Sequence, residues 1–168
     1  MASAIDIRNG FNIYLKRVTS AMPRSSNSRT DEVHPPFAKV RIDVVVGHHD
    51  PRGVVFEPLA AEQIAHYRNV HVVISEPGAI RGNHRHLVGS EITSVVGPMQ
   101  VRIREDGVVR DYAVPKGEIW RFAFPPGVAH AFKNTGEQAA LLASFNTEQH
   151  DPTHPDVARE VLIDAVCD

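Results

Sequence analysis

The chain has 168 residues, of which 42% are hydrophobic and 23% charged, the balance of a globular protein with one domain and its own core. The formal net charge of −2 gives no reason to expect nucleic acid as a partner, and no apolar run reaches the roughly 18 residues of a membrane span, so we expect no membrane partner either. The first residues lack the pattern of an export signal, and the single cysteine, Cys167, excludes an internal disulfide and a thiolate zinc cluster, which together predict a cytoplasmic protein.

The beginning of the chain differs in composition from the rest. Phe11, Ile13 and Leu15 alternate with other residues, which indicates a short strand. Residues 20–36 are polar and contain few apolar side chains, so this stretch cannot bury itself. We therefore predict an N-terminal arm over residues 1–36, packed against a partner subunit, and a main domain over residues 37–168.

From Phe37 onwards, short apolar runs recur with turn residues between them, at the spacing of about 8–12 residues that is typical of an all-β sandwich or barrel. Residues 60–67 are compatible with one short helix, and the spacing of apolar residues over 156–166 predicts a second helix at the C-terminus. The strand-like runs cover residues 40–46, 54–59, 70–75, 92–96, 99–104, 108–114, 119–124 and 139–145.

The chemistry of the chain is concentrated in its ten histidines. His84 and His86 are two residues apart, so on a strand they point to the same side, and a turn at Gly89 leads to Glu91 at the start of the next strand. His130 follows a Pro-Pro-Gly turn. Three imidazoles and one carboxylate suit a divalent transition metal, so we predict a zinc, iron, manganese or nickel ion at these four residues.

The remaining histidines are expected outside this site. His48, His49, His66, His150 and His154 fall in predicted loops or in the predicted short helix. His71 alternates within a strand and could line the same interior, but the pattern alone does not select it. The chain also lacks the glycine-rich and G-x-S-x-G motifs of dinucleotide enzymes, P-loop NTPases and α/β-hydrolases.

These residues resemble the two sequence motifs of the cupin family. Gly78, His84, His86 and Glu91 fit the first motif, G-x5-H-x-H-x3,4-E-x6-G, although its closing glycine, Gly97, comes after five residues instead of six. The end of the second motif, P-x-G-x2-H-x3-N, is matched by Pro125, Gly127, His130 and Asn134, while its leading glycine, Gly117, stands two residues further away than usual. The resemblance implies a single all-β jelly-roll barrel of two antiparallel sheets, a metal held by the four residues named above, and a homodimer.

A narrower resemblance concerns function. The segment from Arg81 to His86, R-G-N-H-R-H, is similar to cupin domains of nucleotide-sugar epimerases and isomerases, such as the C-terminal cupin domain of a capsular polysaccharide synthesis enzyme. The resemblance implies a nucleotide sugar as the small-molecule substrate and proton abstraction next to its carbonyl. Under this hypothesis Arg81 and Asn83 bind the substrate, and His84 and His130 take part in catalysis. If no metal binds, His84 is the expected base.

Several alternatives stay open at this point. The same ligand set would suit a metal-dependent dioxygenase, and a cupin of this kind can also be a non-catalytic module that binds a small ligand. The general acid is not identified, because no motif singles out Tyr14, Tyr67 or Tyr112. Arg102 and Arg104 share one strand face, which we expect to point outward.

Overall fold

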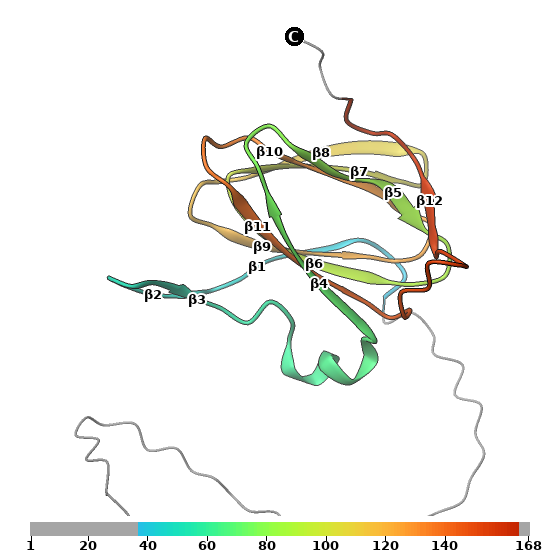
Figure 1. Ribbon diagram of the computed structural model, residues 1–168, viewed down its shortest axis with the longest axis horizontal. Helices are drawn as coiled ribbons and strands as arrows, with labels where there is room; N and C mark the ends of the chain where they lie inside the picture. Colours follow the sequence, from blue (N-terminus) through green and yellow to red (C-terminus); the bar gives the residue numbers. More distant parts are fainter. Residues whose placement is uncertain (1–36, 165–168) are drawn as a thin grey trace, which may run out of the picture. The chain divides into compact units, whose positions relative to one another are not determined.

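Two five-stranded antiparallel sheets face each other in residues 37–164, the part of the chain that the structure, a computed structural model, describes (Figure 1). The predicted arm over residues 1–36 lies outside these residues. The first sheet has the order β1 (Arg41–Val44), β9 (Ile119–Phe124), β6 (Glu91–Val96), β11 (Ala140–Asn146) and β4 (Asn69–Ser75). The second has the order β12 (Val157–Arg159), β5 (Ile80–His86), β10 (Ala129–Asn134), β7 (Met99–Glu105) and β8 (Val108–Val114). This arrangement confirms the predicted jelly-roll barrel.

Local sequence explains why the strands begin and end where they do. In β7 the apolar residues Met99, Val101 and Ile103 are buried, whereas glutamine and arginine occupy the positions between and after them. The turn that joins β7 to β8 contains Asp106 and Gly107, which both have positive φ. A two-residue hairpin turn of the favoured hand requires this conformation, and aspartate followed by glycine adopts it readily.

The space between the two sheets is filled mainly by apolar side chains. The cluster includes Phe122 and Phe124 from β9 and Phe132 from β10. The other buried members come from β6, β7, β8, β11 and the turn before β10: Val95, Met99, Val101, Ile103, Val114, Val128, Ala140 and Leu142. Burial of this set is the main force that holds the sheets together.

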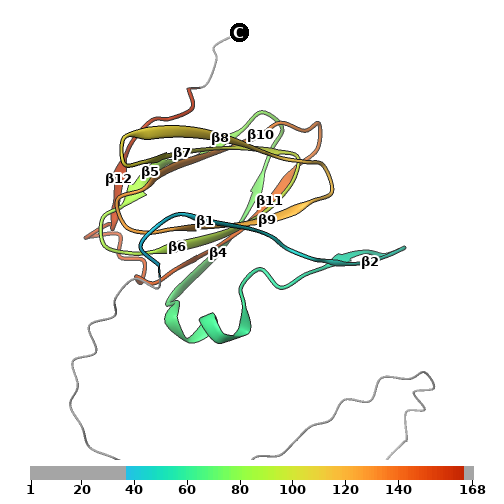
Figure 2. The same ribbon diagram turned by 180° about the vertical axis from the view of Figure 1, so that it is seen from behind.

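A short segment covers the outer face of the first sheet. It contains the 3₁₀ helix η1 (Ala61–His66), at the place where the sequence predicted a short helix, and it lies on the side of the sheet that faces away from the second one (Figure 2). Phe37 and Leu59 pack there against Ile92 and Ala123 of the sheet. A separate hairpin of β2 (His48–Asp50) and β3 (Gly53–Val55) extends beside it.

The C-terminal segment is a correction to the sequence analysis. Residues 157–159 form strand β12, which pairs with the edge of β5, instead of starting the helix predicted over residues 156–166. The edge of β5 offers backbone groups that need partners, and pairing with them outweighs a weak helical spacing of apolar residues. Among the described residues, no helix is long and apolar enough to cross a membrane.

Candidate metal centre

The four predicted ligands meet at one end of the space between the sheets. His84 and His86 come from β5, His130 from the neighbouring β10, and Glu91 from the start of β6 in the opposite sheet. Each offers one ligand atom, and these atoms all lie within 4.8 Å of one another. The ring centroids of His84 and His130 are 4.8 Å apart, and those of His84 and His86 are 5.2 Å apart. Strands far apart in the sequence thus bring the predicted set together.

A β-bulge in β5 shapes this end of the barrel. His130 of β10 pairs with His84, but the next residue, Ala131, pairs with Gly82, so Asn83 is an extra residue in the strand. Gly82 and Asn83 both have positive φ, at 77° and 56°. In a regular strand Arg81 and His84 would point to opposite faces. Because of the extra residue, Arg81 and His84 both line the same cavity.

Glu91 is held as a carboxylate in the centre of the cluster. Its Oε2 lies 2.7 Å from Nε2 of His86, and its Oε1 accepts a hydrogen bond of 2.5 Å from the hydroxyl of Thr93. The same Oε1 is 3.6 Å from Nε2 of His130. Burial by itself would raise the pKa of Glu91, but the hydrogen bond with His86 and the nearby imidazoles outweigh it and lower the pKa of this carboxyl well below its usual value. The cluster therefore contains one permanent negative charge.

His130 and His84 are poised as neutral imidazoles. Burial lowers the pKa of His130 to about 4, and burial also lowers the pKa of His84. His130 Nδ1 lies 3.2 Å from the carbonyl oxygen of Val128, to which it donates, so its Nε2 is the free nitrogen. The ring of His130 is also stacked on Phe124, with centroids 4.1 Å apart.

The Nε2 atoms of His84 and His130 indicate whether the four clustered residues fit a metal. Both nitrogens are buried and lack a hydrogen-bond partner among the described residues. Buried polar atoms normally have a partner, and an ion would satisfy both of them. Neutral imidazoles with one carboxylate are also the donor set that divalent transition metals prefer. The four residues therefore fit a metal such as zinc or iron.

His86 is surrounded by polar groups that orient its ring. Its Nδ1 lies 3.3 Å from Oδ2 of Asp156, and the amide nitrogen of Asn146 lies 3.1 Å from the same Nδ1. Burial disfavours the charged imidazolium, but the hydrogen bond to Glu91 and the charges of Glu91 and Asp156 prevail, so the pKa of His86 is raised. Asp156 was not among the site residues predicted from the sequence, and it lies in the segment between β11 and β12.

The cluster lines a cavity of about 540 Å³ between the sheets. Arg81 lines it, as the prediction of a substrate-binding role requires. His71 also lines the cavity, as the alternation along its strand allowed. His150 was expected outside the site, but it lines the cavity as well. The other lining residues mix polar and apolar groups: Asn69, Val73, Gly82, Phe132, Leu142, Ser144, Asn146 and Val157.

The side chain of Asn83 is hydrogen-bonded to the backbone of the C-terminal segment, although it was predicted to bind the substrate. Its side-chain oxygen accepts hydrogen bonds from the backbone nitrogens of Leu162 and Ile163, at 2.8 and 3.0 Å. Its amide nitrogen donates to the carbonyl oxygen of Ile163 at 2.8 Å. The side chain thus fastens the C-terminal segment to β5, and a substrate-binding role for Asn83 stays a prediction.

Three further arginines form their contacts outside the metal cavity: Arg102, Arg104 and Arg121. Arg102 pairs with Asp111 and Arg104 with Glu160, which confirms that both side chains point away from the core. Arg121 donates to the backbone carbonyl of Glu57 at 2.7 Å. Each of these cations therefore stabilises a strand or a loop.

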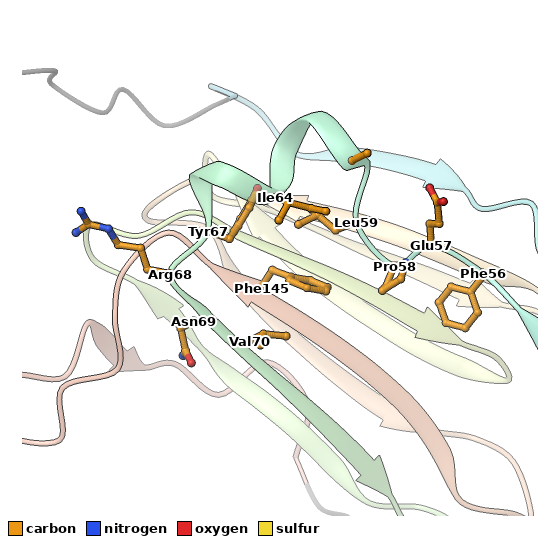
Figure 3. Close-up of a pocket in the computed structure, with 11 residues that line it drawn as sticks. Phe56, Glu57, Pro58, Leu59, Ile64, Tyr67, Arg68, Asn69, Val70 and Phe145 are labelled. Atoms are coloured by element: carbon orange, nitrogen blue, oxygen red, sulfur yellow. The ribbon is translucent and has the colours of Figure 1, made fainter. Parts of the chain in front are cut away.

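The tyrosines considered as candidates for the general acid do not line the metal cavity in the described part of the chain. Tyr112 packs against the core, and Tyr67 lines a second cavity of about 500 Å³ on the outer face of the first sheet. Figure 3 shows Ile64, Leu59 and Phe145 around this cavity, which is largely apolar. Burial raises the pKa of Tyr67 to about 12. Tyr14 lies outside the described residues.

Comparisons with known proteins agree with the fold. The family model described as the polysaccharide biosynthesis C-terminal domain matches residues 48–158. The capsular polysaccharide assembling protein CapF from Staphylococcus aureus has a solved structure that matches with a TM-score of 0.53 and 26% identity, over 70% of this chain and 33% of CapF. The present chain therefore spans about a third of that protein. No curated protein matches the sequence.

Two more distant structures share the fold. The sugar 3,4-ketoisomerase QdtA from Thermoanaerobacterium thermosaccharolyticum, solved in complex with TDP, matches with a TM-score of 0.56 and 17% identity, over 72% of this chain and 88% of QdtA. The rmlC epimerase of Mycobacterium tuberculosis matches with a TM-score of 0.55 and 17% identity, over 68% of this chain and 66% of the epimerase. At this identity the likeness supports the barrel and not its chemistry.

Proposed function

The chain belongs to the polysaccharide biosynthesis C-terminal domain family, and on that basis we propose that it is a metal-binding cupin enzyme that epimerises or isomerises a nucleotide-linked keto-sugar. One observation carries the proposal: the cluster of His84, His86, Glu91 and His130 contains two buried imidazole nitrogens that have no hydrogen-bond partner within residues 37–164. QdtA and the rmlC epimerase, which share the fold, are a sugar ketoisomerase and an epimerase. The cavity beside the cluster has about 540 Å³, within the usual range for small-molecule sites.

The reaction follows from the acidity of a C–H bond next to a ketone. A metal bound at the four ligands would act as a Lewis acid for the sugar carbonyl and stabilise the enolate that forms when this proton leaves. Glu91 contributes a fixed negative charge to the ligand set, and His84 and His130 contribute neutral nitrogens. The hydrogen bond from His130 to the backbone of Val128 holds its ring in the required orientation.

Arg81 is the group that we assign to the diphosphate of the nucleotide sugar. The bulge in β5 turns its side chain into the cavity that contains the ligands. A guanidinium presents several donors in one plane and binds phosphate oxygens in pairs, which suits a diphosphate. We expect Arg81→Ala to weaken binding of the nucleotide sugar, measured by calorimetry, while the metal content stays the same.

The experiment that tests the proposal begins with elemental analysis of protein purified without added metal. We expect a stoichiometric ion in the natural protein and its loss in the double variant His84→Ala, His130→Ala. Absence of an ion above background would overturn the metal-dependent form of the proposal. Stoichiometric iron that reacts with oxygen would favour the dioxygenase instead.

The second step of the same experiment measures chemistry. TDP- and UDP-linked 4-keto-sugars are incubated with the protein in heavy water, and mass spectrometry follows deuterium next to the carbonyl. Incorporation that depends on the protein supports an epimerase or isomerase. Binding of the sugars without any incorporation would indicate the non-catalytic alternative.

The homodimer implied by the cupin resemblance is part of the proposal as well. Light scattering of the purified chain at several concentrations is the direct measurement. A mass equal to one chain at all concentrations would contradict it.

A further inference from the structure

The proposed reaction needs a proton-transfer group that stays free when an ion is bound. The four ligand side chains direct their nitrogens and carboxylate to a common point, so they are occupied in the metal-bound protein. A guanidinium such as that of Arg81 has no acceptor for a proton. Among the described residues that line the cavity, the remaining side chains with an imidazole nitrogen are His71 and His150.

The two histidines differ in how firmly the fold holds them. His71 is in the middle part of β4, and its backbone pairs with Ser144 of β11 along an uninterrupted ladder. His150 follows β11, outside any strand or helix. A base must be held in a defined position relative to the C–H bond, and a side chain on a strand meets this condition better than one on a loop.

The sheet also places His71 at a useful distance from the ligands. His71 pairs with Ser144, and Ser144 pairs with Thr93 on the next strand. The hydroxyls of Ser144 and Thr93 are 2.8 Å apart, and Thr93 donates to Glu91. Strands are about 4.8 Å apart, so the backbones of His71 and Thr93 are separated by roughly 10 Å. This space can hold a sugar ring with the ligand cluster on one side and the imidazole on the other.

The side chain of His71 is exposed, so its nitrogens are accessible to a ligand in the cavity.

We propose that His71 is the general base of the enzyme, which removes the proton next to the carbonyl of the bound keto-sugar. This inference rests on the proposed function and identifies the catalytic residue that the metal ligands cannot supply. The C–H bond breaks, its proton moves to an imidazole nitrogen of His71, and its electron pair forms the enolate. His71 exchanges this proton with solvent, and return of a proton from His71 to the neighbouring carbon, with a proton shift between the two oxygens, moves the ketone. In an epimerisation, a proton from solvent reaches the other face of the same carbon and inverts it, while His71 releases its own proton to solvent. No oxidant or reductant is consumed.

The test compares three single variants of the full chain: His71→Gln, His150→Gln and His66→Gln. His66 lies in η1 on the outer face, so its variant is the matched control for loss of an exposed imidazole. Each protein is assayed for metal content, for affinity for TDP-4-keto-6-deoxyglucose and a UDP-linked 4-keto-sugar, and for the rate of deuterium incorporation from heavy water.

We expect His71→Gln to lower the rate of deuterium incorporation by about 10²–10⁴-fold, the usual contribution of a general base, with unchanged metal content and sugar affinity. His66→Gln should keep the natural rate. Incorporation at the natural rate in His71→Gln, or a comparable loss in His150→Gln alone, would overturn the assignment. If the natural protein incorporates no deuterium into any of the sugars, the proposed function is wrong. This outcome differs from a failure of the His71 assignment alone, in which the natural protein is active and His71→Gln is equally active.

Discussion

Asp156 connects His86, one of the four predicted metal ligands, to the turn that leads into Glu91. Its Oδ1 accepts a hydrogen bond from the backbone nitrogen of Val88 at 2.7 Å, and its Oδ2 accepts one from Gly89 at 2.9 Å. The same Oδ2 is 3.3 Å from Nδ1 of His86. One carboxylate thus fixes the orientation of an imidazole and the path of the chain towards the next ligand. Groups of this kind set the orientation and basicity of metal-ligating histidines.

We expect Asp156→Asn to weaken metal binding by about 10–100-fold, because the amide holds His86 less firmly and makes it a poorer donor. Competition with a chelator of known affinity measures this effect directly. Asp151→Asn is the matched control, since Asp151 accepts its hydrogen bonds from the exposed Thr153 and lies outside the ligand cluster. Equal metal affinity in Asp156→Asn and the natural protein would show that the contact does not support the site.

At the scale of elements, the bulge in β5 decides which side chains of that strand enter the cavity. A Cβ atom on Gly82 would lie 2.8 Å from the carbonyl oxygen of His130, closer than side chains approach backbone atoms. Gly82 also has a φ of 77°, which disfavours any residue with a side chain. The close approach of β5 and β10 at this point therefore depends on a glycine.

We expect Gly82→Ala to destabilise the protein by more than Gly78→Ala, in urea unfolding monitored by fluorescence. Gly78 has a similar φ of 73°, but nothing lies within 4 Å of the position of its Cβ. The control therefore carries only the conformational penalty of about 1–3 kcal/mol, while Gly82→Ala also forces β5 and β10 apart. Equal losses in the two variants would mean that the strands adjust without strain.

The C-terminal strand is the second element that acts on β5. It pairs with the strand that carries His84 and His86, and Asn83 fastens the residues that follow it. We expect Asn83→Gly, which tolerates the positive φ but removes the amide, to speed hydrogen exchange of the backbone amides of Leu162 and Ile163. Exchange in β7 and β8 serves as the internal reference. Unchanged protection of the C-terminal segment would show that strand pairing alone holds it.

At the scale of the whole molecule, the space between the sheets divides into an apolar part and a polar part. On the inner face of the first sheet Val95 pairs with Leu142, and further along the same strands Glu91 pairs with Asn146. The apolar part forms the core, and the polar part contains the four predicted metal ligands. The fold can keep buried polar groups at one end because the apolar contacts at the other end supply most of the stability.

Stability should therefore depend on the apolar part. We expect Ile103→Ala to destabilise the protein by about 2–5 kcal/mol, because Ile103 is 2% exposed and its loss leaves a cavity. Ile74→Ala is the matched control, since Ile74 is 65% exposed, and a surface change of this kind stays within about 0.5 kcal/mol. Urea unfolding measures both. Similar losses for the two variants would contradict this description of the core.

The sequence by itself determined the barrel and placed His84, His86, Glu91 and His130 in one cluster, whose metal binding stays a prediction. The alternation of apolar and polar residues specifies the strands locally, and turn residues such as Asp106-Gly107 specify where they end. The spacing of two residues places His84 and His86 on one face of a strand, independently of the rest of the chain. Only the tertiary structure decided which other groups reach the cavity. The bulge brings in Arg81, strand pairing replaces the expected C-terminal helix and delivers Asp156, and the pairing of β4 with β11 presents His71. These outcomes depend on contacts between distant parts of the chain, and a local pattern contains no information about such contacts.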